Sequence, residues 1–392
     1  MTSRPTLGQV LRCVIQSPLG AALHLSPQHW KTVRALAACR TSALGGQLFR
    51  CTNCQREHFV AHSCRNRHCP QCQGARAVDW LQQQEAALLP IPYFHVVFTL
   101  PHSLNGVIRQ NRRAFFKLLF GAASQTLVEF GAGRLQAQLG ITAVLHTWSQ
   151  TLLDHYHLHC IVSGGGVALD GTRWISSPAH YLFPVRALSQ MFRGKFLTGL
   201  KDLYQADKLE FYGQWEPLVK PRQFASWLQE ASRSEWVVYA KRPFAGPQQV
   251  LAYLALYTHR VAMSNRRLIS ADAQSVTFAY KDYADGSKQK TMTLGLVEFV
   301  RRFCLHVLPE RFVKIRHYGL LGNRRRQERL ARARNLLGIS VLPSPEPMRP
   351  GQEHCPQMPR ACCPVCRQPT LVLLWEVAPQ RAAWPVAILD SS

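Results

Sequence analysis

The sequence contains few acidic residues and no long apolar segment. Only 22 Asp and Glu residues accompany 47 Lys and Arg residues, so the formal net charge is +25 and the isoelectric point is about 10.1. A folded core does not need this excess, which indicates a polyanionic partner, either nucleic acid or an anionic membrane surface. The chain contains no run of about 18 or more apolar residues, which is the length needed to span a bilayer. It also contains no basic amphipathic segment that could anchor it to a membrane surface. We therefore expect a nucleic-acid partner and no membrane association.

A secretory segment is also missing. The first twenty residues lack an apolar region followed by a cleavage site, so we expect a cytoplasmic protein. In a reducing compartment, clustered Cys-x-x-Cys pairs among the thirteen cysteines indicate metal binding rather than disulfides. Hydrophobic residues make up 47% of the 392 residues, which is enough for two or three folded domains.

Composition divides the chain into three regions. Residues 1–89 hold a helical start and a Cys-rich block, residues 90–338 alternate strand-like and helical runs and end in a basic segment, and residues 339–392 hold a Pro-rich linker and a small Cys-containing tail. Strands are expected at 93–100, 141–148, 157–163 and 236–240, and a hairpin at 276–294 around Asp285-Gly286. This pattern predicts an α+β protein.

Two Cys-x-x-Cys pairs in the first region predict a structural zinc site. Cys51-x-x-Cys54 and Cys69-x-x-Cys72 are separated by fourteen residues, and two such pairs can close a tetrahedron of thiolates around Zn²⁺. We expect these four cysteines to bind one ion, in a closed site that is not catalytic. Between the pairs, Cys64 and His68 could replace a ligand or bind a second ion. Alternatively, Cys64 is packed in the interior and His68 faces solvent.

A further pair lies near the C-terminus. Cys363-x-x-Cys366 is a half-site, which Cys355, His354 or Cys362 could complete. A single pair of this kind is a weak indication of zinc.

The segment His157-Leu158-His159 carries the clearest sign of chemistry. On a strand, residues i and i+2 share a face, so the two imidazoles project together while Leu158 turns to the apolar side. Two neutral imidazoles form a partial metal site that needs a third ligand. If the strands around Asp154 form a hairpin, Gln150 comes beside His157, and we expect it to be that ligand. Asp154, His155 and His95 are alternatives, and a merely hydrogen-bonded histidine pair is the non-metal interpretation.

Two tyrosines follow at helical spacing. Tyr253 and Tyr257 lie at i and i+4, on one face of an expected helix. Aromatic residues at this spacing usually fill a core. The adjoining segment, however, is polar and basic, with Arg260, Arg266 and Arg267, so a tyrosine there can meet a phosphate.

Arginine is frequent between residues 301 and 334. It binds phosphate better than lysine does, because its planar guanidinium can donate two hydrogen bonds at once. We expect this segment to bind DNA phosphates rather than to form a disordered solubilising tail, with contacts from Arg316, Arg324, Arg325 and Arg326. Beside the Cys-rich block, Arg65, Arg67 and Arg76 either contact the DNA backbone or form a solvated basic face.

Taken together, these motifs resemble the HUH two-tyrosine rolling-circle transposases of insertion sequences, of the ninety-one type. The resemblance rests on the histidine pair, the tyrosine pair and segments 63–70, 95–101, 257–262 and 315–319, and it covers roughly residues 33–323. It implies an N-terminal zinc-binding module followed by an HUH endonuclease domain, with a central antiparallel sheet and flanking helices. The basic, Pro-rich C-terminal tail lies largely outside the resemblance.

The resemblance implies a DNA transposase with Mg²⁺ or Mn²⁺ at the histidines. Tyr253 or Tyr257 would attack a phosphodiester of single-stranded DNA and give a 5′-phosphotyrosine and a free 3′-OH. Rejoining then needs no nucleotide cofactor, in agreement with the missing Gly-x-x-x-x-Gly-Lys-Ser/Thr loop. The partners would be the ends of the protein's own element and a target DNA, and self-association stays open.

Three other interpretations compete with this one. A zinc-dependent DNA-binding regulator explains the charge and the cysteines but gives the histidine and tyrosine pairs no role. A hydrolytic nuclease would use water in place of tyrosine and would tolerate both Tyr→Phe changes. An RNA-binding protein is less consistent with the sequence, because the aromatic pattern of common RNA-binding modules is missing.

Overall fold

The computed structural model describes residues 4–85, 87–241, 249–250, 261–339 and 362–380. The fold is α+β, and the chain forms two compact units that are both discontinuous in sequence. The cysteine-rich unit combines Met1–Arg76, Val261–Val307 and the described part of Pro343–Ser392, and the central-sheet unit combines Ala77–Arg260 with Leu308–Leu342. The regions expected from composition were consecutive, whereas here two later segments return to the N-terminal unit.

An antiparallel sheet of six strands forms the middle of the central-sheet unit. The strands are β3 (Tyr93–Thr99), β4 (Ala137–Trp148), β5 (Asp154–Ala168), β6 (Trp174–Ser176), β7 (Val238–Lys241) and β11 (Ile315–Gly319). Their order is β11-β4-β5-β3-β7, and β6 pairs with β5. The expected central antiparallel sheet is therefore confirmed, although β4 and β5 are longer than the sequence indicated.

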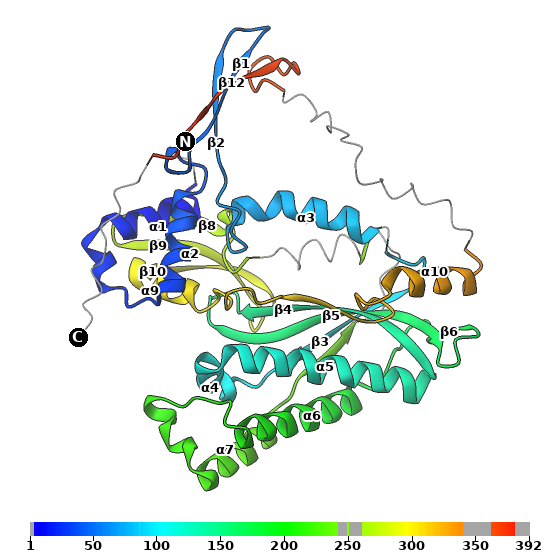
Figure 1. The fold of residues 1–392 in the computed structure, drawn as a ribbon. Coiled ribbons are helices and arrows are strands. Elements are labelled where there is room, and N and C mark those ends of the chain that lie inside the picture. The colour runs from blue at the N-terminus through cyan, green and yellow to red at the C-terminus, as the bar shows by residue number, and fades with distance from the viewer. Residues whose placement is uncertain (1–3, 86, 242–248, 251–260, 340–361, 381–392) are drawn as a thin grey trace. The chain divides into compact units, whose positions relative to one another are not determined.

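Helices cover one face of this sheet. They are α4 (Asn105–Gln110), α5 (Arg112–Leu135), α6 (Val185–Gln205) and α7 (Pro221–Arg233), with α5 next to the strands and α6 packed on α5 and on β7 (Figure 1). Phe98 and Leu158 lie in one buried cluster with Phe116 of α5 and Phe192 of α6. Because side chains alternate along a strand, the intervening residues point to the opposite face. There, α10 (Arg326–Leu336) packs in a second apolar cluster with Ile161 of β5.

The cysteine-rich unit contains helices and two small antiparallel sheets. Its elements are α1 (Leu7–Gln16), α2 (Pro27–Ala38), β1 (Gly46–Cys51), β2 (Glu57–Ala61), β8 (Leu268–Ala271), β9 (Ser275–Asp282), β10 (Lys288–Gly295), α9 (Leu296–Cys304) and β12 (Leu371–Val377). Helix α1 packs against α2 and α9, and α3 (Pro70–Glu85) continues from this unit into the central-sheet unit. The hairpin expected around Gly286 is confirmed as β9–β10.

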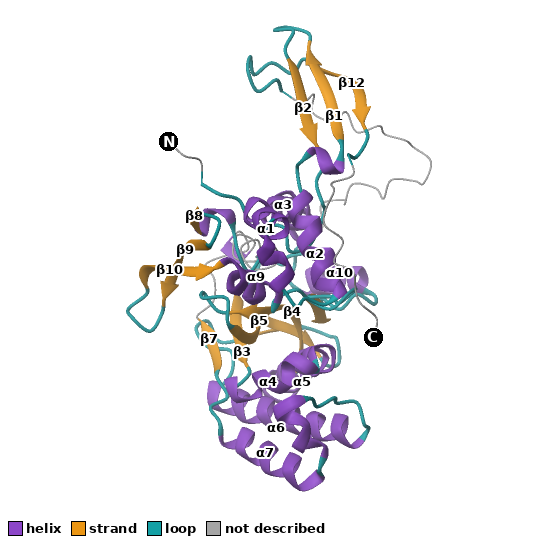
Figure 2. Ribbon diagram, turned by 90° about the vertical axis from the view of Figure 1, so that its left-hand side faces the viewer, coloured by secondary structure: helices purple, strands orange, loops and turns teal. Residues whose placement is uncertain are grey.

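The second small sheet joins distant parts of the chain. Its order is β12-β1-β2, so a C-terminal strand pairs with the first hairpin of the protein (Figure 2). Short 3-10 helices lie at Pro18–Ala22, Ser42–Leu44, His102–Leu104, Gly213–Val219 and Asn265–Arg267. No helix within the described residues is long and apolar enough to cross a membrane.

Candidate active site and metal centres

The β4–β5 hairpin brings a third histidine to the histidine pair. In its register, His146 lies opposite His157, and Trp148 lies opposite Asp154. Leu158 is fully buried in the apolar cluster under α5 and α6, so the two imidazoles of the pair point to the other face, as the alternation predicted.

Three imidazoles converge on this face. The ligand nitrogens of His146, His157 and His159 all lie within 4.8 Å of one another. The Nε2 atoms of His157 and His159 are 3.1 Å apart, and the ring of His146 stands edge-on to His159 with centroids 4.5 Å apart. Since nitrogen ligands bind transition-metal ions at about 2.0–2.1 Å, a 3.1 Å separation is compatible with two nitrogens on one ion. The arrangement therefore fits a divalent metal ion.

Hydrogen bonds set the tautomers of the pair. His157 Nδ1 lies 2.9 Å from the carbonyl oxygen of His155, so it carries the proton and donates, and Nε2 is the unprotonated nitrogen that a metal ion would need. His159 Nδ1 lies 2.9 Å from Nε2 of His95. Burial, together with the nearby charge of Lys241, lowers the pKa of His95 to about 4, so this ring is neutral and can accept the bond. Such partners orient metal-binding histidines.

Gln150 lies in the turn between β4 and β5, and the register puts His146, not Gln150, directly opposite His157. The sequence placed the turn at Asp154, but that residue already begins β5. Its buried carboxylate pairs with Arg109 and accepts a hydrogen bond of 2.9 Å from the Tyr156 hydroxyl. The expected register was therefore wrong, and it left His146 unrecognised.

The other two alternatives for the third ligand have different partners. The Nε2 of His95 contacts the Nδ1 of His159, whereas the Nε2 of His159 faces His157. His155 Nδ1 lies 3.1 Å from Nε2 of His102. Neither residue is in the group of three imidazoles.

Tyr253, Tyr257 and Arg260 lie outside the described residues. Val250, three residues before Tyr253, is fully buried in the cluster that contains Tyr93 and Ile161. These two residues stand two positions from His95 and His159, and therefore on the same face of the sheet. Val250 therefore lies on the face of the sheet that carries the histidines.

The cysteines form two groups of four, and the pairing expected from the sequence was wrong. One group contains Cys39, Cys64, Cys69 and Cys72, and the other contains Cys51, Cys54, Cys363 and Cys366. Strand β1 ends at Cys51, so Cys51 and Cys54 lie at the turn of the β1–β2 hairpin, and β2 leads the chain away from them before Cys69 and Cys72. His68 and Cys362 belong to neither group, while His354 and Cys355 lie outside the described residues.

The sulfur spacing in the first group fits zinc. Cys39 Sγ lies 3.6 Å from Cys72 and 3.5 Å from Cys69, and Cys64 Sγ lies 3.6 Å from Cys72. A tetrahedron with Zn–S bonds of about 2.3 Å would separate the sulfurs by about 3.8 Å. Hydrogen bonds from Cys64 and Cys69 lower the pKa of Cys39, so this thiol ionises readily. Cys39, at the end of α2, was not recognised from the sequence because it belongs to no Cys-x-x-Cys pair.

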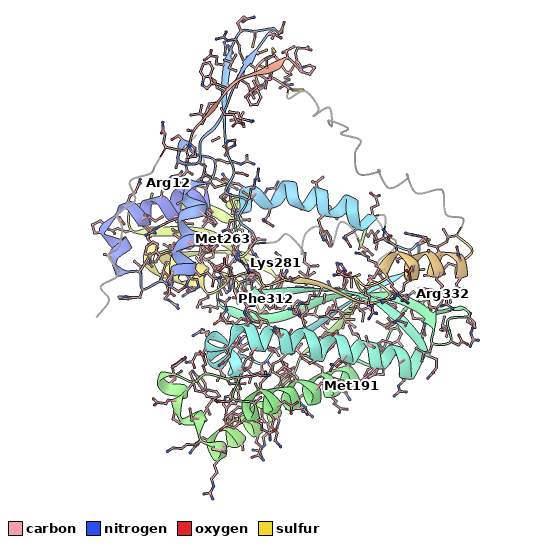
Figure 3. All side chains as sticks on the ribbon, viewed as in Figure 1. Arg12, Met191, Met263, Lys281, Phe312 and Arg332 are labelled. Atoms are coloured by element: carbon pink, nitrogen blue, oxygen red, sulfur yellow. The ribbon has the colours of Figure 1, made fainter. Side chains whose placement is uncertain are left out.

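The arginines expected to bind DNA have different environments. Arg266, Arg324 and Arg325 are exposed. Arg267 donates to the carbonyl oxygens of Ala279 and Ala262, and Arg326 donates to Gln84. The guanidinium of Arg316 lies over the rings of Phe120 and Phe312, the latter labelled in Figure 3.

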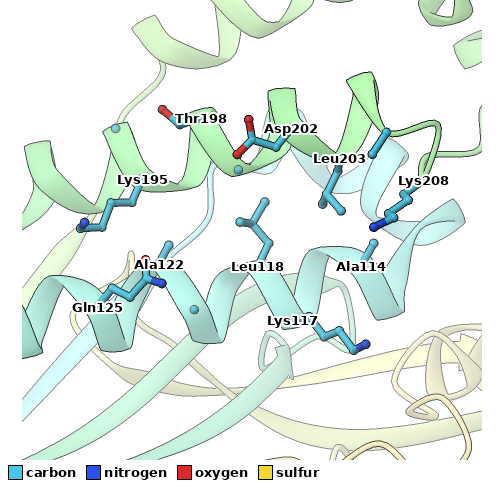
Figure 4. Close-up of a pocket in the computed structure, with 14 residues that line it drawn as sticks. Ala114, Lys117, Leu118, Ala122, Gln125, Lys195, Thr198, Asp202, Leu203 and Lys208 are labelled. Carbon is cyan, nitrogen blue, oxygen red and sulfur yellow. The ribbon is translucent and has the colours of Figure 1, made fainter.

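A groove of about 910 Å³ runs between α5 and α6, lined by residues that include Lys117, Leu118, Lys195 and Asp202 (Figure 4). Its lining residues come from the helices that cover the other face of the sheet, and none of the histidines contributes to it. The groove is therefore separate from the histidine site.

Comparisons with known proteins relate both parts of the chain to transposases. A family model described as a putative transposase matches residues 140–329, and another, described as a transposase zinc-binding domain, matches residues 14–100. The chain is 43% identical over 379 residues to the putative transposase y4qJ of Sinorhizobium fredii, a match that covers 95% of each chain. It is 27% identical over 301 residues to the transposase for insertion sequence element IS801 of Pseudomonas savastanoi pv. phaseolicola, covering 75% of this chain and 70% of that protein. No solved structure matches the chain.

Proposed function

Because this chain belongs to the insertion-sequence transposases of the ninety-one type, we propose that it cuts and rejoins single-stranded DNA with a tyrosine nucleophile in rolling-circle transposition. A transposase acts on DNA, which accounts for the net charge of +25. The substrates would be the ends of its own element and a target strand. The cytoplasmic location expected from the sequence remains a prediction.

The observation that carries the proposal is the convergence of three buried imidazoles on one face of the central sheet. His146, His157 and His159 would hold Mg²⁺ or Mn²⁺, and nitrogen ligands favour Mn²⁺. The bound ion would neutralise charge that develops on a non-bridging phosphate oxygen during the displacement. His95 and the His155 carbonyl hold the ring orientations through the two 2.9 Å hydrogen bonds.

Tyr253 or Tyr257 would supply the nucleophile. The phenol oxygen loses its proton and attacks phosphorus, the bond to the 3′ oxygen breaks, and that oxygen takes up a proton to become a 3′-OH. In the second transfer, a 3′-OH of another strand attacks the phosphotyrosine and releases the tyrosine. One phosphate ester forms as another breaks in each step, so no nucleotide is consumed. Two tyrosines would allow two successive transfers. Val250, buried on the histidine face just before Tyr253, supports this placement.

Exposed arginines would hold the DNA backbone. Arg324 and Arg325 in the central-sheet unit and Arg266 in the cysteine-rich unit are the best candidates among the described residues, because their guanidinium groups face solvent. Arg267 and Arg326 already donate hydrogen bonds within the protein, so we assign each of them a structural role in its own unit rather than a DNA contact. Replacing an exposed arginine should weaken binding uniformly across sequences and reduce its salt dependence.

A covalent-adduct assay tests the mechanism. Full-length protein is incubated with labelled single-stranded DNA from the flanks of its gene and Mn²⁺, and a denaturing gel separates adduct from free DNA. We expect an adduct with wild type that is lost in the Tyr253→Phe/Tyr257→Phe double variant. Tyr283→Phe serves as the control, because Tyr283 is exposed in the β9–β10 turn.

Paired variants test the third ligand. We expect His146→Ala to abolish the adduct and Mn²⁺ binding, and Gln150→Ala to keep both. His180→Ala, an exposed histidine of the same unit, is the control. If Gln150→Ala loses the metal and His146→Ala keeps it, the ligand set proposed here is wrong. Cleaved DNA without an adduct, produced equally by the double tyrosine variant, would identify a hydrolytic nuclease instead. DNA binding without cleavage would point to a regulator.

A further inference from the structure

The second cysteine group is built from two turns with the same backbone geometry. In the first turn, the Gln55 N–H donates to the Cys51 carbonyl over 2.8 Å, and the Cys51 N–H donates to the Arg56 carbonyl over 2.9 Å. Gln55 has a left-handed φ of 57°. The first Cys-x-x-Cys pair therefore lies in a tight turn, in which Gln55, the fifth residue counted from Cys51, has the left-handed conformation that changes the chain direction.

The second turn repeats this pattern more than 300 residues later in the sequence. The Arg367 N–H donates to the Cys363 carbonyl over 2.8 Å, and the Cys363 N–H donates to the Gln368 carbonyl over 2.9 Å. Arg367 has a φ of 60°. Both turns adopt a conformation that costs free energy in a residue other than glycine, and they face each other with all four sulfurs together.

We infer that Cys51, Cys54, Cys363 and Cys366 bind a zinc ion of their own, which fastens the C-terminal segment to the N-terminal hairpin. Cys51 Sγ lies 3.6 Å from Cys366 Sγ, and Cys54 Sγ lies 3.6 Å from Cys363 Sγ. These distances are close to the roughly 3.8 Å of a zinc tetrathiolate and far from the roughly 2.05 Å of a disulfide. The match to the zinc-binding domain ends at residue 100 and the transposase match at residue 329, so neither includes the C-terminal pair.

Groups around the sulfurs suit ionised thiols. The Cys54 N–H donates to Cys51 Sγ over 3.4 Å, and the Thr370 hydroxyl lies 3.0 Å from the same sulfur. His58 Nε2 lies 3.3 Å from Cys363 Sγ. Donors of this kind favour thiolates, which are the form that binds metal. The ion is assigned as zinc rather than iron because half of its ligands belong to the zinc-binding domain.

The strand pairing gives the ion a structural role. Strand β12 pairs with β1 from Gly46↔Val377 to Cys51↔Leu371. The last pair of this register therefore contains Cys51, which is one of the four proposed ligands. Val372, Leu373 and Trp375 of β12 remain exposed, so this short strand has few buried contacts to hold it. The ion would then provide the link that keeps the C-terminal strand in place.

Metal analysis of the full-length protein tests the inference. We expect two zinc ions per chain for wild type, and one for Cys363→Ser/Cys366→Ser and for Cys51→Ser/Cys54→Ser. Cys64→Ser/Cys69→Ser should also lose one ion, from the other group. Cys362→Ser is the matched control and should keep two, because the exposed Cys362 is the neighbour of a ligand but not in the group. Wild type with one ion, or an unchanged content in Cys363→Ser/Cys366→Ser, would overturn the inference, and iron in place of zinc would overturn the assignment of the ion.

Hydrogen exchange tests the fastening role by a second route. In Cys51→Ser/Cys54→Ser, amides of β12 should exchange on the order of tenfold faster or more, although the substitutions lie about three hundred residues away in sequence. Amides of β5 should keep their wild-type rates, which shows that the variant is folded. Unchanged exchange in β12 alongside a lost zinc ion would refute the fastening role.

Discussion

The hydrogen bond between His95 and His159 allows the proposed metal site to be tested without removing a proposed ligand. If His159 binds metal through Nε2, its Nδ1 carries a proton and donates to His95, whose low pKa keeps that ring neutral. His95→Leu removes the acceptor that faces the buried His159 Nδ1. Such a loss costs about 1–3 kcal/mol, and loss of an outer partner typically weakens metal affinity by about 10–100-fold. We therefore expect the Kd for Mn²⁺ to rise by about 10–100-fold.

The assay is a Mn²⁺ titration of the full-length protein followed by electron paramagnetic resonance. The Mn²⁺ concentration that gives half-maximal DNA adduct should shift by the same factor, while the yield at saturating Mn²⁺ recovers. His95→Gln should keep most of the affinity because its amide oxygen can accept the bond. His317→Leu is the control, since it removes another histidine of the same sheet, one that bonds Thr142 instead.

Two outcomes would refute this role for His95. Wild-type Mn²⁺ affinity in His95→Leu would show that the bond does not influence the site. Equal loss in His95→Leu and His95→Gln would show that the ring matters for packing rather than as an acceptor.

Three further predictions concern stability, measured by urea unfolding. Burial lowers the pKa of His95 from 6.5 to about 4, so between these two pH values the unfolded chain binds more protons than the folded chain. The unfolding free energy should therefore fall by up to about 3 kcal/mol as the pH decreases from 6.5 to about 4, and by less in His95→Gln. Ser163→Ala removes the buried acceptor of the Gly140 N–H, at 2.8 Å, and should cost about 1–3 kcal/mol. Gly319→Ala should cost more than about 1 kcal/mol, because the residue has a φ of 60° and its Cβ would overlap the Leu139 carbonyl oxygen.

Much of the central sheet could be predicted from local composition. β3 consists almost entirely of aromatic and β-branched residues, and successive side chains of a strand point to opposite faces of the sheet. That alternation by itself places His157 and His159 on one face, with Leu158 in the core. The face depends only on the strand period, which is a local property.

The third histidine could not be predicted because hairpin register depends on the turn. Asp154 is the turn residue that the sequence favours, since Asp is common in turns. In the structure the left-handed position is Leu152, with a φ of 61°. A leucine there gives no recognisable signal, so the expected turn is misplaced by two residues and the register moves with it. The sequence does contain one usable indication: His146, on the strand that precedes the turn, is a candidate third ligand to be considered beside Gln150.

The cysteine groups could not be predicted for a different reason. Pairs that are adjacent in sequence do not need to share an ion, and six or more candidate cysteines allow many combinations. The β1–β2 hairpin sends Cys51 and Cys54 toward the C-terminal strand, while Cys39 reaches the other group from the end of a helix. Both groupings join residues that are far apart in sequence, and no local sequence pattern indicates which cysteines come together.

The two kinds of site therefore depend on their ions in opposite ways. The three histidines come from one hairpin of a buried sheet, so strand pairing and outer hydrogen bonds set their positions without an ion. That preorganisation suits catalysis, in which an ion with open positions must meet a phosphate. The thiols of the second cysteine group come from two segments that are distant in sequence, and β12 leaves several apolar residues exposed, so the proposed ion would supply the connection itself. Removing a metal ion from the histidines should leave the fold intact, whereas removing one from the thiolates should release a segment of the chain.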